Sequence, residues 1–389
     1  MPTSPEASAR LEVVCLGSPR EMGHTQGVAL ARKIHAVCQD LANLEAFRLQ
    51  QPWWLPYSAY RWLAGQRAWR FLDRPLARDY PAMHQRLAGI AEGAGISLKS
   101  VYLCNALEPL LSSVGGCTVY PGACSAVAVR GRRSATGEPI IAKNFDFLPL
   151  IQPYYLVRES RPHGRRRAVE FTTAPFAGAY DGINEDGLCI TYNYAFTTDT
   201  PTGTPAPISM AIAEALERCG TVSEATAWIA SRPRWGGGLL MLADATGDIA
   251  SLELSSTRSQ VRRPGPGEDV LFHTNALVSA PLRDVQIPWE AVYTDRAPMP
   301  LRGERLHESA ERRDRRFTEL LAKTDVIGAA ELAAIMADHG PDGIPDACTP
   351  CVHSTYWYTT ACVQLFPRSR RMRVAYDTAC QARYEDVLL

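Results

Sequence analysis

The chain has no net charge, since its 389 residues include 41 lysines and arginines against 41 aspartates and glutamates. This balance gives no electrostatic reason to expect a nucleic acid or an anionic membrane as a partner. No stretch approaches the roughly 18 continuous apolar residues of a membrane helix. The N-terminal segment contains Pro2, Pro5 and Glu6 and lacks a long apolar core, so we do not expect it to act as a signal peptide.

The cysteines do not have the arrangement of a disulfide framework. There are eleven of them, an odd number, at irregular spacing. In a chain of this length they fit a reducing compartment, and we expect a cytoplasmic protein. The sequence also has no internal repeat, no low-complexity tract and no clear linker. Its 46% hydrophobic and 21% charged residues are ordinary for a globular protein.

The sequence changes character near residues 114–116. Before this point, residues 21–49 and 80–111 place apolar residues at helical spacing. After it, turn residues separate short alternating runs, which is typical of antiparallel strands. The predicted strands are 124–129, 139–145, 154–160, 167–173, 187–194, 238–255, 259–263, 269–275, 358–367 and 371–378, with helices at 207–231, 308–324 and 329–340. This order predicts an α+β fold with antiparallel sheets covered by helices.

Cys124 opens a run of small residues, Cys-Ser-Ala-Val-Ala-Val, and a turn leads from it to a second apolar run. The second run ends in the polar cluster Lys-Asn-Phe-Asp, residues 143–146. If the two runs form a hairpin, the return strand brings Lys143, Asn144 and Asp146 beside the start of the first strand. A carboxylate there can hold an amine, and a cation can lower the pKa of a thiol.

Acyl-transfer chemistry with a cysteine needs a base and donors for the oxyanion. None of the eight histidines lies in a context that suggests the base. If the peptide bond before Cys124 is cut, the new α-amino group has a pKa near 8 and can be the base for its own thiol. The hairpin is therefore compatible with an N-terminal nucleophile.

Several other segments support a family resemblance. They are EMGHTQGVALARKI, YPAMHQRLAGIAEGAGISLKSVYLCNALEPL, YDGINEDGLCITYNY, MLADATGDIASLEL, FHTN, ESAERRDRRFTELL, MADHG and CVHSTYWYTTACVQLFP. With the hairpin, they resemble, in order, the cysteine-type N-terminal nucleophile (Ntn) hydrolases of the acyl-coenzyme A:6-aminopenicillanic acid acyltransferase family. Bile-salt hydrolases and penicillin V acylases are more distant relatives. The resemblance covers nearly the whole chain and implies a four-layer αββα sandwich with antiparallel sheets.

The resemblance implies roles for three residues of the hairpin. Cys124 matches the nucleophile, and Asp146 matches the carboxylate that orients its freed amine. Lys143 stands where bile-salt hydrolases have an arginine, but an ammonium cannot form the bidentate contact of a guanidinium. Ala123 precedes the nucleophile where the family usually has Gly or Asp-Gly.

Three further site residues follow from the resemblance. Asn193 resembles the asparagine whose main-chain N–H contributes to the oxyanion hole, and Asn275 the one whose side-chain amide completes it. Arg313 matches a downstream arginine that supports the site. The motif Thr-Asn-Ala around Asn275 replaces the usual Thr-Asn-His. Satisfying backbone groups at turns is the alternative role of both asparagines.

The resemblance predicts a precursor that is cut between Ala123 and Cys124. Residues 1–123 form a mainly helical α-chain and residues 124–389 a β-chain, and together they make one Ntn domain. The expected reaction forms a Cys124 thioester from a small-molecule amide or acyl thioester. If the acyl group then passes to water, the protein is an amidohydrolase. If it passes to an amine, the protein is an N-acyltransferase, for example in specialised metabolism. No cofactor, metal, nucleic acid or membrane is expected to take part.

Three alternatives remain open from the sequence. Cys117, in Gly-Gly-Cys-Thr, is a rival nucleophile, although it lies farther from Asp146 than Cys124 does. The chain could instead be a non-catalytic, uncleaved binding protein on the same scaffold. It could also bind zinc through Cys348-x-x-Cys351 with His339 and His353 nearby, but a second ligand pair at standard spacing is missing.

Overall fold

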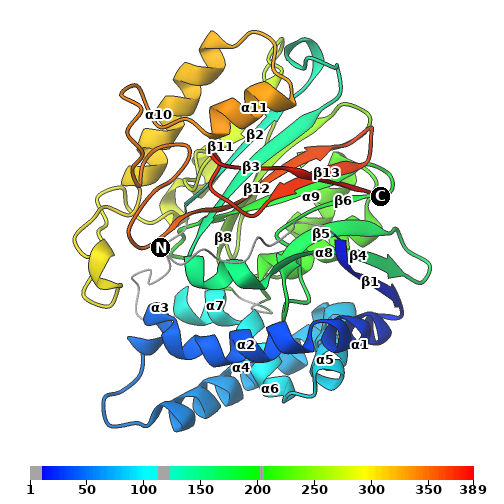
Figure 1. The fold of residues 1–389 in the computed structure, drawn as a ribbon, viewed down its shortest axis with the longest axis vertical. Helices are drawn as coiled ribbons and strands as arrows, with labels where there is room; N and C mark the ends of the chain where they lie inside the picture. Colours follow the sequence, from blue (N-terminus) through cyan, green and yellow to red (C-terminus); the bar gives the residue numbers. More distant parts are fainter. Residues whose placement is uncertain (1–10, 113–122, 202, 204–205) are drawn as a thin grey trace.

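Two β-sheets form the centre of the molecule (Figure 1). A computed structural model describes residues 11–112, 123–201, 203 and 206–389, so Cys117 lies outside the described residues. One sheet has eight strands in the order β1-β4-β5-β6-β7-β8-β9-β10, and the other has six in the order β11-β2-β3-β12-β13-β14. Among these strands only β1 and β4 pair in parallel, and every other neighbouring pair is antiparallel.

The strands and helices have the following bounds. The strands are β1 (Leu11–Gly17), β2 (Ala123–Val129), β3 (Ile140–Phe147), β4 (Tyr155–Pro162), β5 (Ala168–Thr173), β6 (Asp181–Asn184), β7 (Cys189–Ala195), β8 (Gly237–Ala243), β9 (Ile249–Leu254), β10 (Ser259–Arg262), β11 (Val270–His273), β12 (Tyr358–Phe366), β13 (Arg371–Ala375) and β14 (Glu385–Leu388). The α-helices are α1 (Pro19–Ala29), α2 (Ala31–Asp40), α3 (Glu45–Arg48), α4 (Tyr57–Asp79), α5 (Pro81–Ala94), α6 (Leu98–Asn105), α7 (Leu107–Ser112), α8 (Ile208–Arg218), α9 (Val222–Ser231), α10 (Glu308–Lys323) and α11 (Ala329–Met336). Short 3₁₀ helices lie at Leu41–Asn43, Gly131–Arg133, Pro149–Tyr154, Ala280–Val285 and Met299–Leu301.

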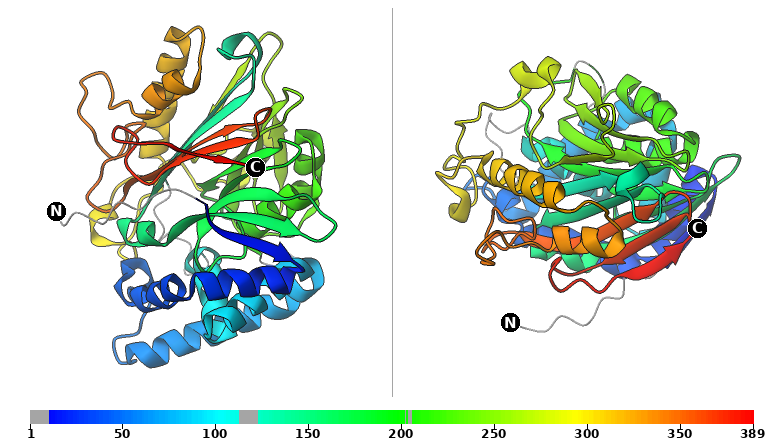
Figure 2. Two further views of the ribbon diagram at one scale, coloured as in Figure 1. Left: turned by 45° about the vertical axis from the view of Figure 1, so that its right-hand side comes forward. Right: turned by 90° about the horizontal axis from the view of Figure 1, so that it is seen from above.

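Helices cover the outer faces of both sheets, which confirms the predicted αββα sandwich. On the six-stranded sheet, Val127 and Ile140 pack against Phe317 of α10 and Leu332 of α11. On the eight-stranded sheet, α8 lies against β5, β6 and β7, and α9 lies against β9. The inner faces of the two sheets share one large core. The helices α1 to α7 form a further layer at one end of the sandwich, seen in blue and cyan (Figure 2).

Strand β2 shows why its sequence alternates between alanine and valine. All seven of its residues are buried, so both faces of the strand meet other parts of the protein. Ala126 and Ala128 face the core between the sheets, whereas Val127 and Val129 face the cluster around α10. Because successive side chains point to opposite faces, the small residues mark the inner face and the branched residues the helix-covered face.

Some predicted elements have different bounds in the structure. The helix expected at 207–231 is two helices, because Cys219 is extended and Thr221 caps the start of α9 through a hydrogen bond to the Glu224 N–H. The helix expected at 21–49 likewise divides at Leu30 and again at residues 41–44, which gives α1, α2 and α3. Strands β1 and β14 and helix α4 were not predicted; β14 has only four residues, and α4 contains Pro75.

Helices α1 and α5 approach each other at glycines. A Cβ atom on Gly23 would lie 2.1 Å from the Arg86 carbonyl oxygen, and one on Gly89 would lie 2.1 Å from the Arg20 carbonyl oxygen. No side chain fits at such distances, and glycine is the residue that permits this close backbone approach. The two helices therefore pack through their backbones.

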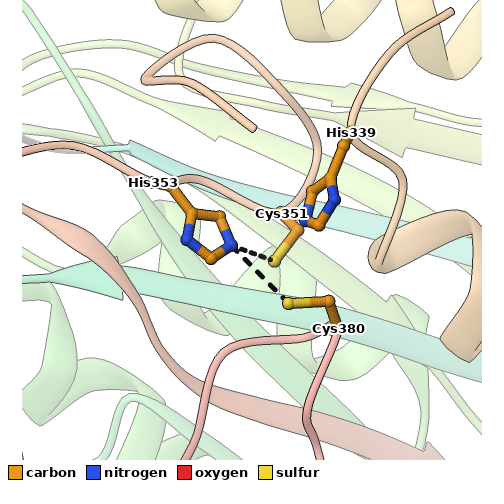
Figure 3. A group of neighbouring side chains, drawn as sticks. All are labelled: His339, Cys351, His353 and Cys380. Carbon is orange, nitrogen blue, oxygen red and sulfur yellow. Dashed lines mark hydrogen bonds between the residues drawn. The ribbon is translucent and has the colours of Figure 1, made fainter. Parts of the chain in front are cut away.

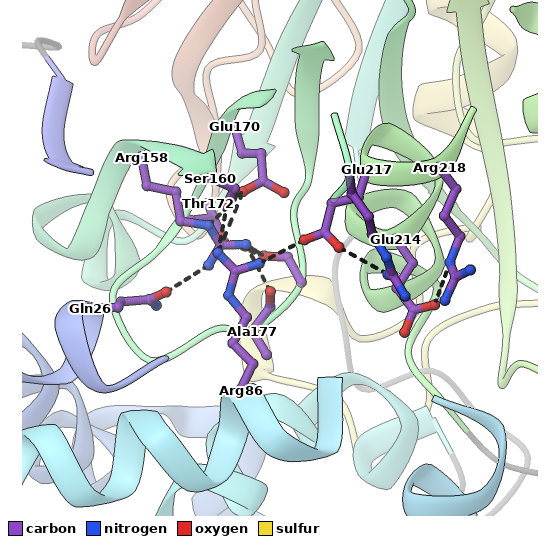
Figure 4. Close-up of polar contacts among 12 residues, drawn as sticks. Gln26, Arg86, Arg158, Ser160, Glu170, Thr172, Ala177, Glu214, Glu217 and Arg218 are labelled. Carbon is purple, nitrogen blue, oxygen red and sulfur yellow. Dashed lines mark hydrogen bonds and ion pairs between the residues drawn. The ribbon is translucent and has the colours of Figure 1, made fainter. Parts of the chain in front are cut away.

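Buried charged side chains join the helical layer to the eight-stranded sheet (Figure 4). Arg158 of β4 donates to Gln26 Oε1 of α1 at 2.9 Å. Arg86 of α5 donates to Ser160 Oγ of β4 at 2.6 Å and to Glu217 of α8 at 3.4 Å. Both arginines are fully buried. These contacts connect residues on either side of the predicted cleavage site.

Among the helices of the described residues, none is both long enough and apolar enough to cross a membrane.

Three tryptophans near the start of α4 lie at the surface. Trp53, Trp54 and Trp62 are 95%, 65% and 62% exposed, so this aromatic segment does not line the cavities described below.

Candidate active site

The hairpin predicted around Cys124 is formed by β2 and β3. Cys124 lies opposite Phe145, Ala126 lies opposite Lys143, and Ala123 lies opposite Asp146. Directly opposed residues point to the same face of a sheet, and neighbours along a strand point to opposite faces. The Cys124 thiol therefore faces the core between the sheets with Phe145 and Lys143. The Asp146 carboxyl group lies on the other face, which α10 and α11 cover.

The main chain of Cys124 is held by two side chains from elsewhere in the fold. Its N–H donates to Asn275 Oδ1 at 2.9 Å, and Arg313 donates to its carbonyl oxygen at 2.6 Å. Arg313 also donates to Asn275 Oδ1 at 2.8 Å and to Ser125 Oγ at 2.9 Å. Strand β11 ends at His273, which pairs with Ala126. The side chain of Asn275 therefore accepts the Cys124 N–H, in the place where a main-chain carbonyl would accept it if β11 were longer.

Asp146 is fully buried beside the start of β2. Its Oδ1 accepts a hydrogen bond from Thr359 Oγ1 at 2.6 Å, and its Oδ2 has no hydrogen-bond partner within the described part of the chain. Burial raises the pKa of this carboxyl group to about 7, although Arg313, Thr359 and Lys143 oppose the shift. A buried carboxyl oxygen without a partner is a costly arrangement. It leaves one acceptor available near the Cys124 main chain.

Lys143 forms an ion pair that connects the two sheets. Its Nζ donates to Asp181 Oδ1 of β6 at 2.6 Å, and both side chains are fully buried. Asp181 also accepts from the Tyr192 N–H at 3.1 Å. Burial raises the pKa of Asp181, while Lys143 lowers it. The positive charge of Lys143 is therefore largely balanced by Asp181, a residue that the sequence analysis did not identify.

Asn193 and Asn275 form reciprocal contacts between β7 and the segment after β11. Asn193 Nδ2 donates to the Thr274 carbonyl oxygen at 3.0 Å, and Asn275 Nδ2 donates to the Tyr194 carbonyl oxygen at 2.8 Å. Asn193 Oδ1 is buried, and none of the residues that the structure describes hydrogen-bonds to it. The two predicted oxyanion residues thus lie side by side. All six predicted site residues come together around the hairpin.

An apolar cavity adjoins the Cys124 thiol. Its walls include Leu41, Leu44, Phe145, Phe176, Tyr180 and Tyr192. Glu108 of α7 also lines it and accepts a hydrogen bond from Tyr192 Oη at 2.7 Å. Burial raises the pKa of the Glu108 carboxyl group to about 7. Sequence reasoning missed Glu108, because nothing in its helix indicates that it faces a cavity.

Burial also raises the pKa of the Cys124 thiol to about 12, although Lys143 lowers it. The thiol of the uncut chain is therefore protonated at neutral pH. No histidine of the described residues hydrogen-bonds to it, so a Cys–His pair of the protease type is not formed there. An activating base has to come from another group.

A second cavity lies on the other side of the predicted cleavage site. It is lined by Ala123, Arg313, Cys348 and Trp357, together with several charged residues. Ala123 and Cys124 thus line different cavities, one polar and one apolar. The peptide bond between Ala123 and Cys124 therefore lies between the two cavities.

A comparison with protein families matches residues 133–377, more than half of the chain, to the family described as "Acyl-coenzyme A:6-aminopenicillanic acid acyl-transferase". The chain belongs to this family. The match includes Lys143, Asp146, Asn193, Asn275 and Arg313, and it begins after Cys124. No curated protein matches the chain.

Solved Ntn-type structures resemble this member of the acyl-transferase family at low identity. An N-acylethanolamine-hydrolyzing acid amidase ortholog from Caenorhabditis elegans is 12% identical, with a TM-score of 0.43 over 68% of this chain and 100% of that one. A conjugated bile acid hydrolase mutant from Clostridium perfringens is 10% identical, with a TM-score of 0.36 over 68% and 97%. Penicillin V acylase from Agrobacterium tumefaciens is 13% identical, with a TM-score of 0.39 over 68% and 86%. The family assignment therefore rests on the family match.

Proposed function

We propose that the protein is a self-processing enzyme that uses Cys124 to cleave or transfer an acyl group. The observation that carries the proposal is the position of Cys124 at the start of β2. There its thiol faces an apolar cavity, while Asn275 and Arg313 hold its main chain. Family membership supports acyl chemistry in general. The roles of individual residues below are part of the proposal.

The first proposed step frees the Cys124 amine. The thiol sulfur attacks the carbonyl carbon of Ala123, the carbon–nitrogen bond breaks, and the Cys124 nitrogen gains the proton that the thiol loses. Water then hydrolyses the resulting thioester to give a carboxylate on Ala123 and a free thiol on Cys124. The products are residues 1–123 and residues 124–389, held together by the buried contacts between them.

The freed amine is the proposed base for catalysis. It takes the thiol proton as the sulfur attacks the carbonyl carbon of an amide or an acyl thioester, and it then protonates the leaving amine or thiolate. The unpartnered Oδ2 of Asp146 supports a role in orienting the resulting ammonium group. In the uncut chain, Cys124 N–H bonds to Asn275 instead, so the amine–Asp146 contact would form only after the cut.

The oxyanion of the tetrahedral intermediate needs hydrogen-bond donors. We assign them to the Asn193 main-chain N–H and the Asn275 side-chain amide. The hydrogen bonds of both residues across β7 and residues 274–275 support a rigid placement. When water or an amine attacks the thioester, the Cys124 amine removes its proton and the thiol is regenerated. The products are a carboxylic acid from water or an amide from an amine.

The acyl group is proposed to be apolar. The cavity beside the thiol has mostly aliphatic and aromatic walls, and such surfaces hold a hydrocarbon chain by excluding water. The polar second cavity, on the Ala123 side, fits the leaving group or the amine acceptor. The same thioester serves both hydrolysis and transfer.

Denaturing mass spectrometry of the purified chain tests the self-cleavage. We expect two fragments that separate between Ala123 and Cys124, and we expect Cys124→Ala and Cys124→Ser to leave the chain intact. Incubation with acyl-coenzyme A thioesters and N-acyl amides should add one acyl group to the residue 124–389 fragment. A non-catalytic binding protein would give an intact chain that none of these donors labels.

Cys104→Ser is the matched control for these variants. Cys104 is a second buried cysteine that lines the same cavity, and its thiol lies 3.8 Å from that of Cys38. We expect the control to be cut and labelled as in the unsubstituted chain. If the control were not labelled and Cys124→Ala still were, the nucleophile would be Cys104, which contradicts the proposal.

A further inference from the structure

Four potential metal ligands meet beside the six-stranded sheet (Figure 3). His339, Cys351 and His353 come from the segment between α11 and β12, and Cys380 comes from the segment between β13 and β14. Each offers one ligand atom, and these four atoms lie within 4.8 Å of one another. Parts of the chain that are distant in sequence therefore bring two imidazoles and two thiols together.

The distances suit a tetrahedral ion. His353 Nε2 lies 3.3 Å from Cys351 Sγ and 3.6 Å from Cys380 Sγ. In a tetrahedral zinc site with Zn–S near 2.3 Å and Zn–N near 2.0 Å, neighbouring ligand atoms are about 3.3–3.8 Å apart. The rings of His339 and His353 stand almost perpendicular, at 83°, with their centroids 5.1 Å apart. A small contraction of the group would complete the coordination.

His339 provides an independent sign of a ligand. Its Nε2 atom is buried and has no hydrogen-bond partner among the described residues. An unpartnered buried nitrogen is costly, and a metal ion would satisfy its lone pair. The thiols of Cys351 and Cys380 both lie against His353 Nε2, so three of the four ligand atoms already meet at one point.

We propose that His339, Cys351, His353 and Cys380 bind one Zn²⁺ ion in a closed structural site. Two thiolates and two imidazoles in a tetrahedron are typical ligands of structural zinc. On binding, each thiol releases one proton, and the two histidines coordinate as neutral imidazoles. Four protein ligands leave no open position for a substrate, so the ion stabilises the fold and does not enter the acyl chemistry.

This ligand set corrects the zinc alternative that the sequence suggested. The Cys348-x-x-Cys351 spacing pairs two cysteines, but Cys348 is outside the group of four. Its N–H donates to Asp346 Oδ1 at 2.7 Å, and the residue lines the second cavity. Cys380 takes its place, 29 residues after Cys351 along the chain.

The proposed ion would fix a segment that reaches the active site. Residue 352, next to the ligand Cys351, donates its N–H to Thr359 Oγ1 at 3.0 Å, and Thr359 Oγ1 donates to Asp146. The Pro350 carbonyl oxygen, on the other side of Cys351, accepts from Asn144 Nδ2 at 2.9 Å. Both contacts end on β3, the strand opposite Cys124. Residues of the same segment line the second cavity.

Cobalt titration of the full chain tests the site without using enzyme activity. The protein is stripped with a chelator under reducing conditions and titrated with Co²⁺. We expect one equivalent to produce the visible bands of tetrahedral Co²⁺ and a thiolate-to-cobalt charge-transfer band. Zn²⁺ should displace Co²⁺ and protect the exposed thiol of Cys380 from alkylation.

Variants separate this ligand set from the CxxC motif. Cys380→Ser and His339→Ala should weaken Co²⁺ binding by at least about tenfold, whereas Cys348→Ser should bind one equivalent unchanged. Cys380 is exposed, so its serine variant is expected to fold, which circular dichroism checks. The proposal is overturned if Cys380→Ser binds Co²⁺ like the unsubstituted chain, or if the metal requires Cys348. A Cys351–Cys380 disulfide in place of metal under reducing purification would also overturn it.

Discussion

The carboxyl group of Glu108 lies in a cavity whose walls are otherwise mostly apolar. Its pKa of about 7 means that the group changes charge near neutral pH. Burial causes the upward shift, and the hydrogen bond from Tyr192 opposes it. Below pH 7 the neutral acid adds little polarity to the cavity. Above pH 7 an apolar acyl chain would have to displace water from a carboxylate, which is costly.

We therefore expect KM for apolar acyl donors to rise as the pH increases through 7. Glu108→Gln removes this ionisable group and should give a KM that rises less over the same range, since Asp40 and Asp146 also line the cavity. Initial rates measured from pH 5.5 to 8.5 would check both, and Cys104→Ser supplies a cavity control with the unsubstituted pH dependence. A KM that rises equally in Glu108→Gln would show that another group controls binding.

At the scale of elements, the α1–α5 contact depends on glycines that no other residue can replace. Gly89 lies against the backbone of α1, where a Cβ would come within 2.1 Å of a carbonyl oxygen. Backbone atoms cannot rotate away as the end of a flexible side chain can. A single added methyl group must therefore separate the two helices.

Gly89→Ala should lower the free energy of unfolding by at least about 3 kcal/mol, the upper end of the usual cost of overpacking. Gly65→Ala is the matched control, because Gly65 also lies inside a helix and its added Cβ would have no neighbour closer than 3.4 Å. The control should be stabilised by roughly 0.5–1 kcal/mol, since alanine favours a helix over glycine. Urea unfolding of both variants in a Cys124→Ala chain measures the difference.

At the scale of the whole molecule, buried charges hold together the two parts that the proposed cut would separate. Arg86 is fully buried and contacts Ser160 and Glu217, both beyond the cleavage site. The pair of Arg86 and Glu217 is shielded from water, unlike the pair of Arg20 and Glu92, whose side chains are 60% and 46% exposed. Removing Arg86 leaves the buried Glu217 paired only with Arg165, whose side chain is 32% exposed, at 3.3 Å, so the carboxylate loses much of its compensation.

Arg86→Met should lower the free energy of unfolding by about 3–5 kcal/mol in an uncut Cys124→Ala chain. In the cut protein it should make the fragments 1–123 and 124–389 separate at a lower urea concentration. Arg20→Ala removes an exposed ion pair and should leave the free energy of unfolding nearly unchanged. Equal effects of the two substitutions would show that burial does not decide the strength of these contacts.

The hairpin could be predicted from local sequence patterns, but contacts between segments far apart in the sequence could not. The alternation of β2 and the short return to β3 determine which residues oppose each other, so Asp146 beside Ala123 followed from the sequence. The partner of Lys143 comes from the other sheet, and no spacing rule indicates Asp181. The parallel pairing of β1 with β4 joins segments more than a hundred residues apart. Cys380 was missed for the same reason, because only the fold brings it to His353.

The orientation of β2 has a consequence for the choice of base. The thiol and the Asp146 carboxyl group lie on opposite sides of the sheet, which acts as a wall between them. The nitrogen of Cys124 lies within that wall, so it can be approached from either side. The lone pair of an amide nitrogen is delocalised into the carbonyl group and does not accept a proton, whereas the lone pair of an amine is available to do so. In this arrangement a single broken bond would turn a structural nitrogen into a base that lies between the thiol and the Asp146 carboxyl group.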